Sequence, residues 1–258
     1  MSVTACAALV ERGDPDRFAA TMAAPPGARA NLWPLYAYNL EIARAPWVTP
    51  EPMIAEMRLQ FWIDTVEEIG QGKPPRAHEV AAPLAELINR TGIPPRLLIG
   101  MAEARYWDIG TEPFADRAAF DAHIDTTAGN LMWAAAHALG APADAEAAIR
   151  DFAWGAGLAA WFRAVPELEA RGRIPVIDGR PAALAELAAE GRTRIAAARA
   201  RRAAIPRSAL PALWTGSGAP AILAQVEREP SRVASGTLGQ SDFGRRGGLL
   251  WRALLGRI

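Results

Sequence analysis

The chain has 258 residues, of which 51% are hydrophobic and 22% are charged, and its formal net charge is zero. A chain of this composition can bury a substantial core, which excludes an extended disordered protein. The single cysteine, Cys6, excludes an intramolecular disulfide and a cysteine-based metal cluster. No run of about 20 uncharged apolar residues occurs, so we expect no transmembrane helix. The first residues are charged too early for a secretory signal, and a cytoplasmic location follows as the default expectation.

The net charge of zero hides an uneven distribution. The segment 191–258 holds twelve arginines and three acidic residues, a net charge of +9, so the first 190 residues carry a net −9. A basic segment of this kind indicates an anionic partner: a membrane surface, a nucleic acid or the acidic part of the same chain. We expect no nucleic-acid partner, because the sequence has neither a recognised binding module nor aromatic residues interleaved with the arginines.

Apolar residues recur at the spacing of an α-helix along nearly the whole chain. Thr49 and Asp116 are expected N-caps, and Pro166 is expected to end its helix. Clusters of glycine and proline separate the helical segments, and no stretch alternates with the period of a β-strand. The pattern predicts one all-α domain of roughly eight to ten helices over 1–230 and a basic, partly amphipathic tail over 231–258. The clearest predicted helices cover 32–43, 49–70, 116–140, 142–166 and 181–206.

Five segments, taken in order, resemble the squalene/phytoene synthase family, whose members condense prenyl diphosphates head to head. They are Asp14–Ala20, Leu35–Arg44, Glu56–Trp62, Thr126–Trp133 and Gly155–Pro175. The resemblance implies an isoprenoid-synthase-like bundle of helices around a central cavity. In that family two aspartate-rich helix segments face each other across an apolar cavity and bind magnesium ions, which neutralise the diphosphates.

The first of these two segments keeps the start of the family motif but not its aspartates. Tyr36–Tyr38 match the tyrosine-alanine-aromatic start. The positions that match the three aspartates are occupied by Ala43, Arg44 and Trp47. None of these side chains supplies the carboxylate oxygen that magnesium prefers.

The second segment differs from the family motif in the same way. Arg163, Glu167 and the trailing Arg171–Arg173 match it, but the positions that match its two aspartates are occupied by Ala164 and Leu168. Because carboxylates are missing on both sides, we expect no bound magnesium and no other cofactor. The sequence therefore predicts a cavity without prenyl-transfer chemistry.

Within the family, the stretches "YNLEIAR" and "RLQFW" are more similar to a branch that contains bacterial phytoene-synthase-like proteins and a mitochondrial complex I assembly factor. This resemblance implies a non-catalytic protein that binds an isoprenoid diphosphate or lipid, or that helps to assemble a respiratory complex. One alternative is an active prenyl-diphosphate transferase whose magnesium is held by atypical ligands such as Glu41 and Glu167. Another is a helical scaffold without a cavity, in which Ala43 and Ala164 do not face each other.

The candidate ligand contacts are polar or charged side chains in or near the matching segments. Arginine suits a diphosphate or a lipid headgroup, because its guanidinium donates several hydrogen bonds in one plane. For Arg58 the alternative is a solvated position while its neighbours pack. The three histidines lack the spacing of metal ligands, so neither a metal site nor a catalytic residue is assigned. The candidates are Tyr36, Glu41, Arg44, Arg58, Gln60, Arg163, Glu167 and Arg171.

The end of the sequence predicts a basic amphipathic helix. Trp251, Leu254, Leu255 and Ile258 fall on one helical stripe. Such a stripe suits the surface of an anionic membrane, with the protein peripheral at the inner face of the cytoplasmic membrane. Packing of the stripe onto the helical domain is the alternative. The arginines that flank it are Arg245, Arg246, Arg252 and Arg257.

Overall fold

The computed structural model describes residues 2–258, apart from the side chains of Asp242, Phe243 and Arg246. In this described part the regular secondary structure is entirely helical, which confirms the predicted all-α class. In chain order the α-helices are α1 (Val3–Gly13), α2 (Pro15–Met22), α3 (Pro26–Arg44), α4 (Pro52–Gly70), α5 (Ala81–Thr91), α6 (Pro95–Ala104), α7 (Arg117–Ile124), α8 (Asn130–Ala138), α9 (Glu146–Ala170), α10 (Pro181–Ala200), α11 (Leu210–Trp214), α12 (Ala219–Arg228), α13 (Ser231–Ala234) and α14 (Asp242–Leu255).

Three short helical turns position parts of the site. The 3₁₀ turn η1 (Ala45–Trp47) follows α3, and the 3₁₀ turn η2 (Arg105–Asp108) follows α6. The π-helical turn η3 (Asp125–Gly129) joins α7 to α8, so the helix predicted over 116–140 is interrupted. π-Turns of this kind occur frequently at functional sites.

Local sequence signals explain where several helices begin. The carboxylates of Asp14 and Asp116 cap α2 and α7 by accepting a backbone N–H three residues later, at 2.9 and 2.8 Å. The prediction for Asp116 is confirmed, but the prediction for Thr49 is wrong. The hydroxyl of Thr49 accepts from the backbone N–H of Glu51 at 3.2 Å, which forms a turn ahead of the helix, and α4 begins at Pro52.

Pro166 lies inside α9 and does not end it, contrary to the prediction. A proline in a helix removes one backbone hydrogen bond, which weakens the helix locally. On either side of it Val165 and Leu168 are buried in the core, and their burial offsets that loss. As a result α9 continues to Ala170 and carries Glu167 and Leu168 past the proline.

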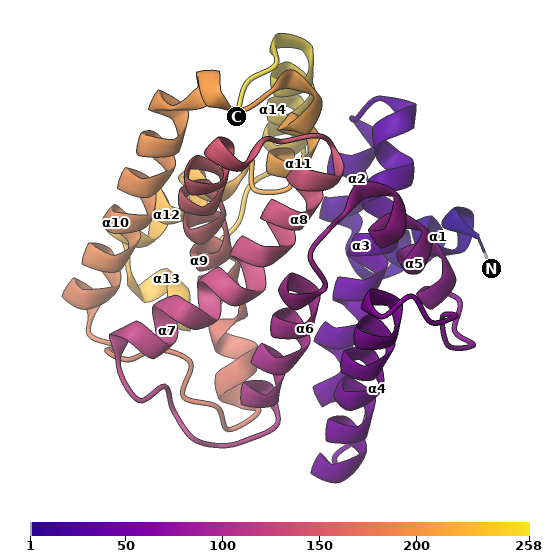
Figure 1. The fold of residues 1–258 in the computed structure, drawn as a ribbon. Helices are drawn as coiled ribbons and strands as arrows, with labels where there is room; N and C mark the ends of the chain where they lie inside the picture. Colours follow the sequence, from indigo (N-terminus) through magenta and orange to yellow (C-terminus); the bar gives the residue numbers. More distant parts are fainter. Residues whose placement is uncertain (1) are drawn as a thin grey trace.

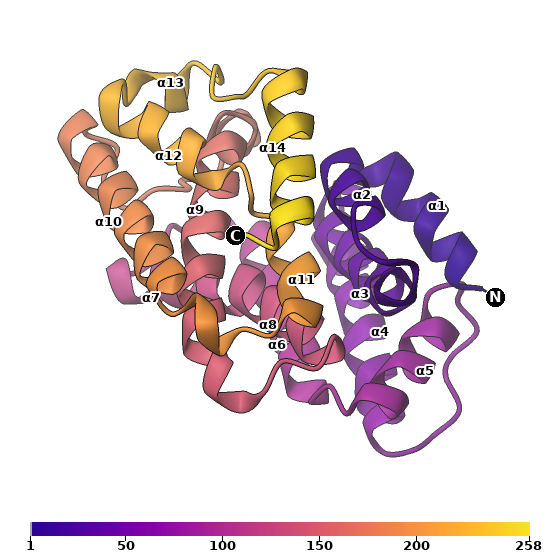
Figure 2. The same cartoon turned by 90° about the horizontal axis from the view of Figure 1, so that it is seen from above.

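The helices form one bundle around α9. Figures 1 and 2 show α10, α12 and α13 on one side of α9 and α1, α2 and α3 on the other, with α8 between them. In Figure 2 the last helix, α14, lies over α11 and beside α2. Buried side chains form a single core that runs from Cys6 to Ile258, so the segment 231–258 packs with the rest of the chain. The predicted boundary at residue 230 stays a prediction.

Candidate functional site: a cavity between α3 and α9

A cavity of about 400 Å³ lies between α3 and α9. Ala43 on α3 and Ala164 on α9 both line it, so the two helices face each other across the same space. A scaffold without a cavity does not agree with this geometry. Small and apolar side chains make up much of the wall: Ala43, Ile124, Ala128, Leu131, Ala160, Trp161, Ala164 and Leu168.

Asp108 brings a buried carboxylate to this cavity from η2. The residue is 5% exposed, and its Oδ2 lies 3.2 Å from Nη1 of Arg105, which also lines the cavity. Burial raises the pKa of Asp108, while the neighbouring Arg105 and Arg173 act in the opposite direction. The carboxylate is therefore already partnered by a guanidinium.

A second charged pair is built from α9 and η1. Arg171 Nη2 lies 2.6 Å from Glu167 Oε1, one helical turn earlier. The Arg171 guanidinium also lies over the indole ring of Trp47, 4.4 Å from its centroid, a cation–π geometry. All three side chains line the cavity, so the positively charged guanidinium of Arg171 is held in place at the cavity wall.

A second hollow, of about 540 Å³, adjoins the first and shares Trp47, Asp108 and Arg171 with it. Arg173 lines this hollow and is 5% exposed. Its Nη2 donates to the carbonyls of Trp107 and Glu112, whereas its Nε and Nη1 have no hydrogen-bond partner. Desolvation lowers the pKa of Arg173. The two hollows thus share one stretch of wall, formed by Trp47, Asp108 and Arg171, and Arg173 adds a second guanidinium on the side of the larger hollow.

Only two of the eight candidate ligand contacts, Glu167 and Arg171, line this cavity. Tyr36 is fully buried behind it, with the Arg17 guanidinium 5.2 Å from its ring centroid, and burial raises its pKa. Glu41 points toward the α4–α5 connection, where its Oε2 lies 3.8 Å from Nε2 of His78. Arg44 is exposed and lies against Gly13 at the end of α1.

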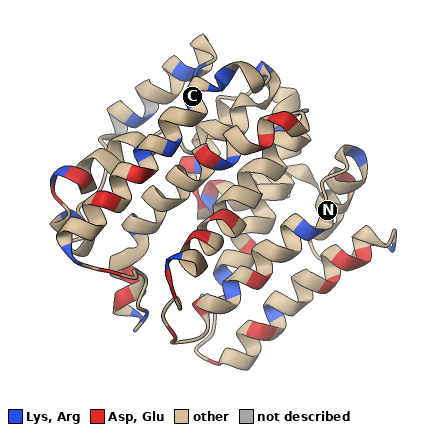
Figure 3. Cartoon of the chain, turned by 60° about the vertical axis from the view of Figure 1, so that its left-hand side comes forward, with Lys and Arg blue, Asp and Glu red and all other residues tan. Residues whose placement is uncertain are grey.

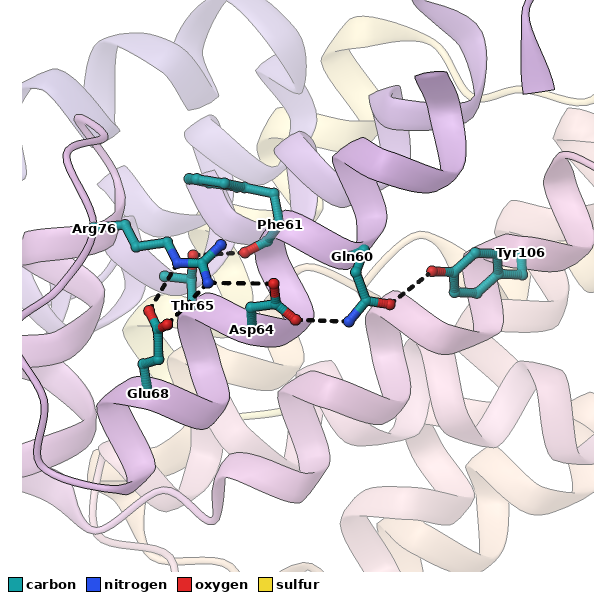
Figure 4. A network of polar contacts seen from close by, with 7 residues as sticks. All are labelled: Gln60, Phe61, Asp64, Thr65, Glu68, Arg76 and Tyr106. Atoms are coloured by element: carbon teal, nitrogen blue, oxygen red, sulfur yellow. Dashed lines mark hydrogen bonds and ion pairs between the residues drawn. The ribbon is translucent and has the colours of Figure 1, made fainter. Parts of the chain in front are cut away.

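The remaining candidates lie elsewhere on the surface. Arg58 is exposed on α4, which agrees with the alternative hypothesis that its side chain is solvated and contacts no ligand. Gln60 belongs to a polar network on the outer side of α4, donating to Asp64 at 2.6 Å and accepting from Tyr106 at 3.4 Å (Figure 4). Arg163 points into a different hollow, where its Nη1 lies 3.8 Å from Asp16 Oδ2.

The sequence reasoning missed five polar residues that line the cavity: Arg17, Asn39, Arg105, Asp108 and Thr127. Arg17 lies in a segment that carries the family resemblance, but no spacing rule relates it to α9. Arg105 and Asp108 are three residues apart, which allows an ion pair on one helical turn. That spacing, together with an acidic residue directly after Tyr106 and Trp107, is the sequence signal that could have indicated this ion pair.

The candidate membrane contacts lie on α14. Trp251, Leu254 and Leu255 are exposed, whereas Arg252 is partly buried and its pKa is lowered by desolvation. Arg245 pairs with Asp16 on α2. The side chain of Arg246 lies outside the described residues. No helix among residues 2–258 is both long and apolar enough to cross a bilayer.

Carboxylates, histidines and the cysteine do not gather into one cluster. Within the described side chains, no group of three or more of these residues could hold a metal ion. The acids at the cavity, Asp108 and Glu167, are each paired with an arginine. The cavity can bind an apolar body through its alanine-rich wall and an anionic group through its arginines.

The arrangement of the helices is similar to that of two solved structures with the all-α isoprenoid-synthase fold, and this is the fold of the chain. A crystal structure of a dehydrosqualene synthase in complex with ligand superposes with a TM-score of 0.77 and 14% identity, covering 98% of this chain and 95% of that one. Squalene synthase HpnC from Alicyclobacillus acidocaldarius superposes with a TM-score of 0.73 and 13% identity, covering 89% and 94%. At these identities the likeness shows the fold.

The family follows from the sequence. The model of the squalene/phytoene synthase family matches residues 10–176, and the chain belongs to this family. NADH dehydrogenase (ubiquinone) complex I assembly factor 6 from Homo sapiens is 25% identical over 135 residues, 52% of this chain and 40% of that protein. The Bos taurus protein is 24% identical over 170 residues, 66% and 51% of the two chains. The match thus spans about half or less of the length of these curated relatives.

Proposed function

We propose that this protein binds a ligand with an apolar chain and an anionic head, an isoprenoid diphosphate or a lipid, without catalysing prenyl transfer. The observation that carries the proposal is the make-up of the cavity wall. Ala43, Ala164 and Leu168, which the family resemblance predicts at the aspartate positions, all line a cavity that is also lined by arginines. A volume of about 400 Å³ is within the range of small-molecule sites.

Magnesium does not fit the donor set of this cavity. The ion prefers about six oxygen ligands in octahedral geometry and usually one or more free carboxylates. Asp108 is held by Arg105, and Glu167 is held by Arg171. Each arginine of this wall also pairs with a carboxylate: Arg17 with Asp14, Arg105 with Asp108 and Arg171 with Glu167. We therefore propose that these arginines bind the anionic head with the N–H groups that their ion pairs leave over.

The alternative, an active transferase with Glu41 and Glu167 as metal ligands, has less support. Glu167 lines the cavity, but Glu41 points toward His78 on the other side of α3. Two carboxylates that do not share a cavity cannot hold one cluster of ions against one substrate.

Incubation with farnesyl diphosphate separates the two functions. Equilibrium dialysis in EDTA should show saturable binding, and addition of magnesium should cause no release of pyrophosphate. Ala164→Leu places a larger side chain in the cavity and should weaken binding at least about tenfold, whereas Ala196→Leu, exposed on α10, should not. Steady pyrophosphate release that disappears in Glu167→Ala would establish the transferase instead.

A second candidate function comes from the relatives, which are named as assembly factors of respiratory complex I. We propose that this chain acts in the assembly of a respiratory complex, with ligand binding as part of that role. Deletion of the gene in the organism that carries it should reduce the amount of assembled complex on native gels. Restoration by the wild-type protein but not by Ala164→Leu would connect assembly to the cavity, and an unchanged complex in the deletion strain would contradict the role.

A further inference from the structure

The helix α14 has two faces of different character, and the outer one is apolar and exposed. Leu249 is buried and Ala253 packs against the core on the inner face. On the opposite face Leu250, Trp251 and Leu254 are 61%, 61% and 69% exposed. With Leu255, these three form what we call the outer stripe of α14. An exposed tryptophan among leucines on one helix is an unusual surface for a soluble domain.

The exposure of the outer stripe does not result from a loosely held helix. The domain binds three backbone carbonyls in the residues that directly follow α14. Trp214 Nε1 donates to the carbonyl of Arg257 at 3.1 Å, and Arg202 Nη2 donates to that of Gly256 at 3.2 Å. Arg199 Nε donates to the carbonyl of Ile258 at 3.0 Å. These contacts satisfy carbonyls at the helix end and fix which face points outward.

Ile258 is also held against the domain. The sequence places it on the stripe with Trp251 and Leu254, but in the structure it is buried. Gly256 adopts a left-handed conformation, with φ of 62°, and ends the helix before Ile258 is reached. The prediction for Ile258 is therefore wrong: the turn at Gly256 takes it inward and leaves the outer stripe unpartnered.

Two exposed arginines lie at the C-terminal end of this helix. Arg257 is exposed beside the stripe, and Arg207 lies against the turn at Gly256, where an added Cβ would be 2.8 Å from its Nη2. Several basic positions, coloured blue, lie around the chain's C-terminus in Figure 3, and because Lys73 is the only lysine in the sequence they are arginines. Nearby acids are already engaged: Asp16 pairs with Arg245 and Asp151 with Arg201. The stripe is thus apolar at its centre and basic at its edge.

From this arrangement we infer that α14 binds the surface of an anionic lipid bilayer. The outer stripe enters the boundary between headgroups and acyl chains, and the flanking arginines contact lipid phosphates. Tryptophan is favoured at this depth, because its ring is apolar and its N–H remains near water. The charge complementarity selects an anionic bilayer over a neutral one. This inference concerns a surface outside the cavity and does not depend on the proposed ligand.

Flotation with vesicles tests the inference on the full chain. Wild-type protein should float with vesicles that contain phosphatidylglycerol and phosphatidylcholine at 1:3, and much less with phosphatidylcholine alone. Trp251→Ser with Leu254→Ser should reduce the bound fraction at least about tenfold, because the apolar contact is removed. Arg207→Gln with Arg257→Gln should reduce binding to the anionic vesicles only.

A matched control is available on α4, which lies well apart from α14 in Figure 1. Met53 and Met57 are 70% and 65% exposed and one turn apart, so Met53→Ser with Met57→Ser removes a similar exposed pair. This variant should float like the wild type, and circular dichroism should be the same for all variants. Two outcomes would overturn the inference. In the first, the wild type stays at the bottom of the gradient with both vesicle types, as expected if the stripe binds another protein. In the second, the α14 variant floats like the wild type. Dialysis with farnesyl diphosphate should give unchanged affinity for the α14 variant.

Discussion

His123 is a buried histidine without a charged partner. It lies among aromatic rings, with centroids 5.7 Å from Trp107, 5.2 Å from Phe114 and 5.1 Å from Trp161. Its Nε2 has no hydrogen-bond partner. Desolvation, helped by the charge of Arg105, lowers the pKa of His123 to about 3. The folded protein thus holds this ring neutral throughout the range in which a free histidine would protonate.

This shift predicts acid sensitivity. Because the folded pKa is lowered from its unfolded value, the contribution of His123 to stability is complete above about pH 6.5 and falls as the unfolded chain gains a proton below it. Between pH 7.5 and pH 5 the free energy of unfolding should drop by about 2 kcal/mol more in the wild type than in His123→Phe. Urea unfolding at both pH values measures this difference, and parallel losses in the two proteins would contradict it.

Arg163 and Arg171 offer a comparison within one helix. The family resemblance predicts both in the second motif segment, but Arg171 lines the cavity and Arg163 points toward Asp16 in another hollow. Arg171→Gln should weaken farnesyl diphosphate binding by about 1.5–3 kcal/mol, the contribution of a hydrogen bond to a charged group. Arg163→Gln should leave the affinity unchanged. Equal losses in isothermal titration would show that the ligand reaches both hollows.

At the scale of the helices, α9 and α10 approach each other closely at Gly155. A Cβ on Gly155 would lie 2.7 Å from the backbone carbonyl of Gly191 and 2.7 Å from Cγ1 of Ile195. The absence of a side chain at this point lets the two helices touch.

Gly155→Ala should therefore destabilise the protein, although alanine favours helices. Separating α9 from α10 costs about 1–3 kcal/mol, more than the ~1 kcal/mol gained in helix propensity. Gly27→Ala in α3 is the control, because nothing lies within 4 Å of its added Cβ, and it should be neutral or slightly stabilising. A thermal melt that is unchanged for Gly155→Ala would mean that the helices can shift without cost.

For the elements, the sequence predicted the N-cap at Asp116 correctly, because its cause is local, although the local prediction at Thr49 was wrong. The cap at Asp116 needs only its own side chain and the backbone three residues on. Pro166 failed as a stop signal because the packing of Val165 and Leu168 is a tertiary effect. The π turn at Asp125–Gly129 was not predicted, because the residues on either side of it keep a helical spacing, which indicates one helix over the whole segment.

At the scale of the molecule, the acidic and basic parts of the chain pack into one body. The ion pairs Asp16–Arg245 and Asp151–Arg201 join the first 190 residues to the basic segment. Leu249 and Ile258 complete a core that includes Trp214 on α11. The chain should then unfold in one cooperative transition, with equal calorimetric and van't Hoff enthalpies. Two separate transitions would support an independent tail over 231–258.

The sequence by itself determined the helical class, the family and the identity of the side chains at the two motif segments. It also determined that an amphipathic basic helix lies near residue 251. These properties depend on residue spacing along one helix, which the chain carries locally.

Only the tertiary structure decided which polar groups meet in the cavity. Glu41 is two residues from Ala43, yet it points toward His78, while Arg17 and Asp108 enter the cavity from α2 and η2. The rotation of each helix is set by the core around it, and so is the direction in which the outer stripe of α14 faces. Periodicity tells which residues share a face, but the neighbour that this face meets is fixed by packing of the whole chain.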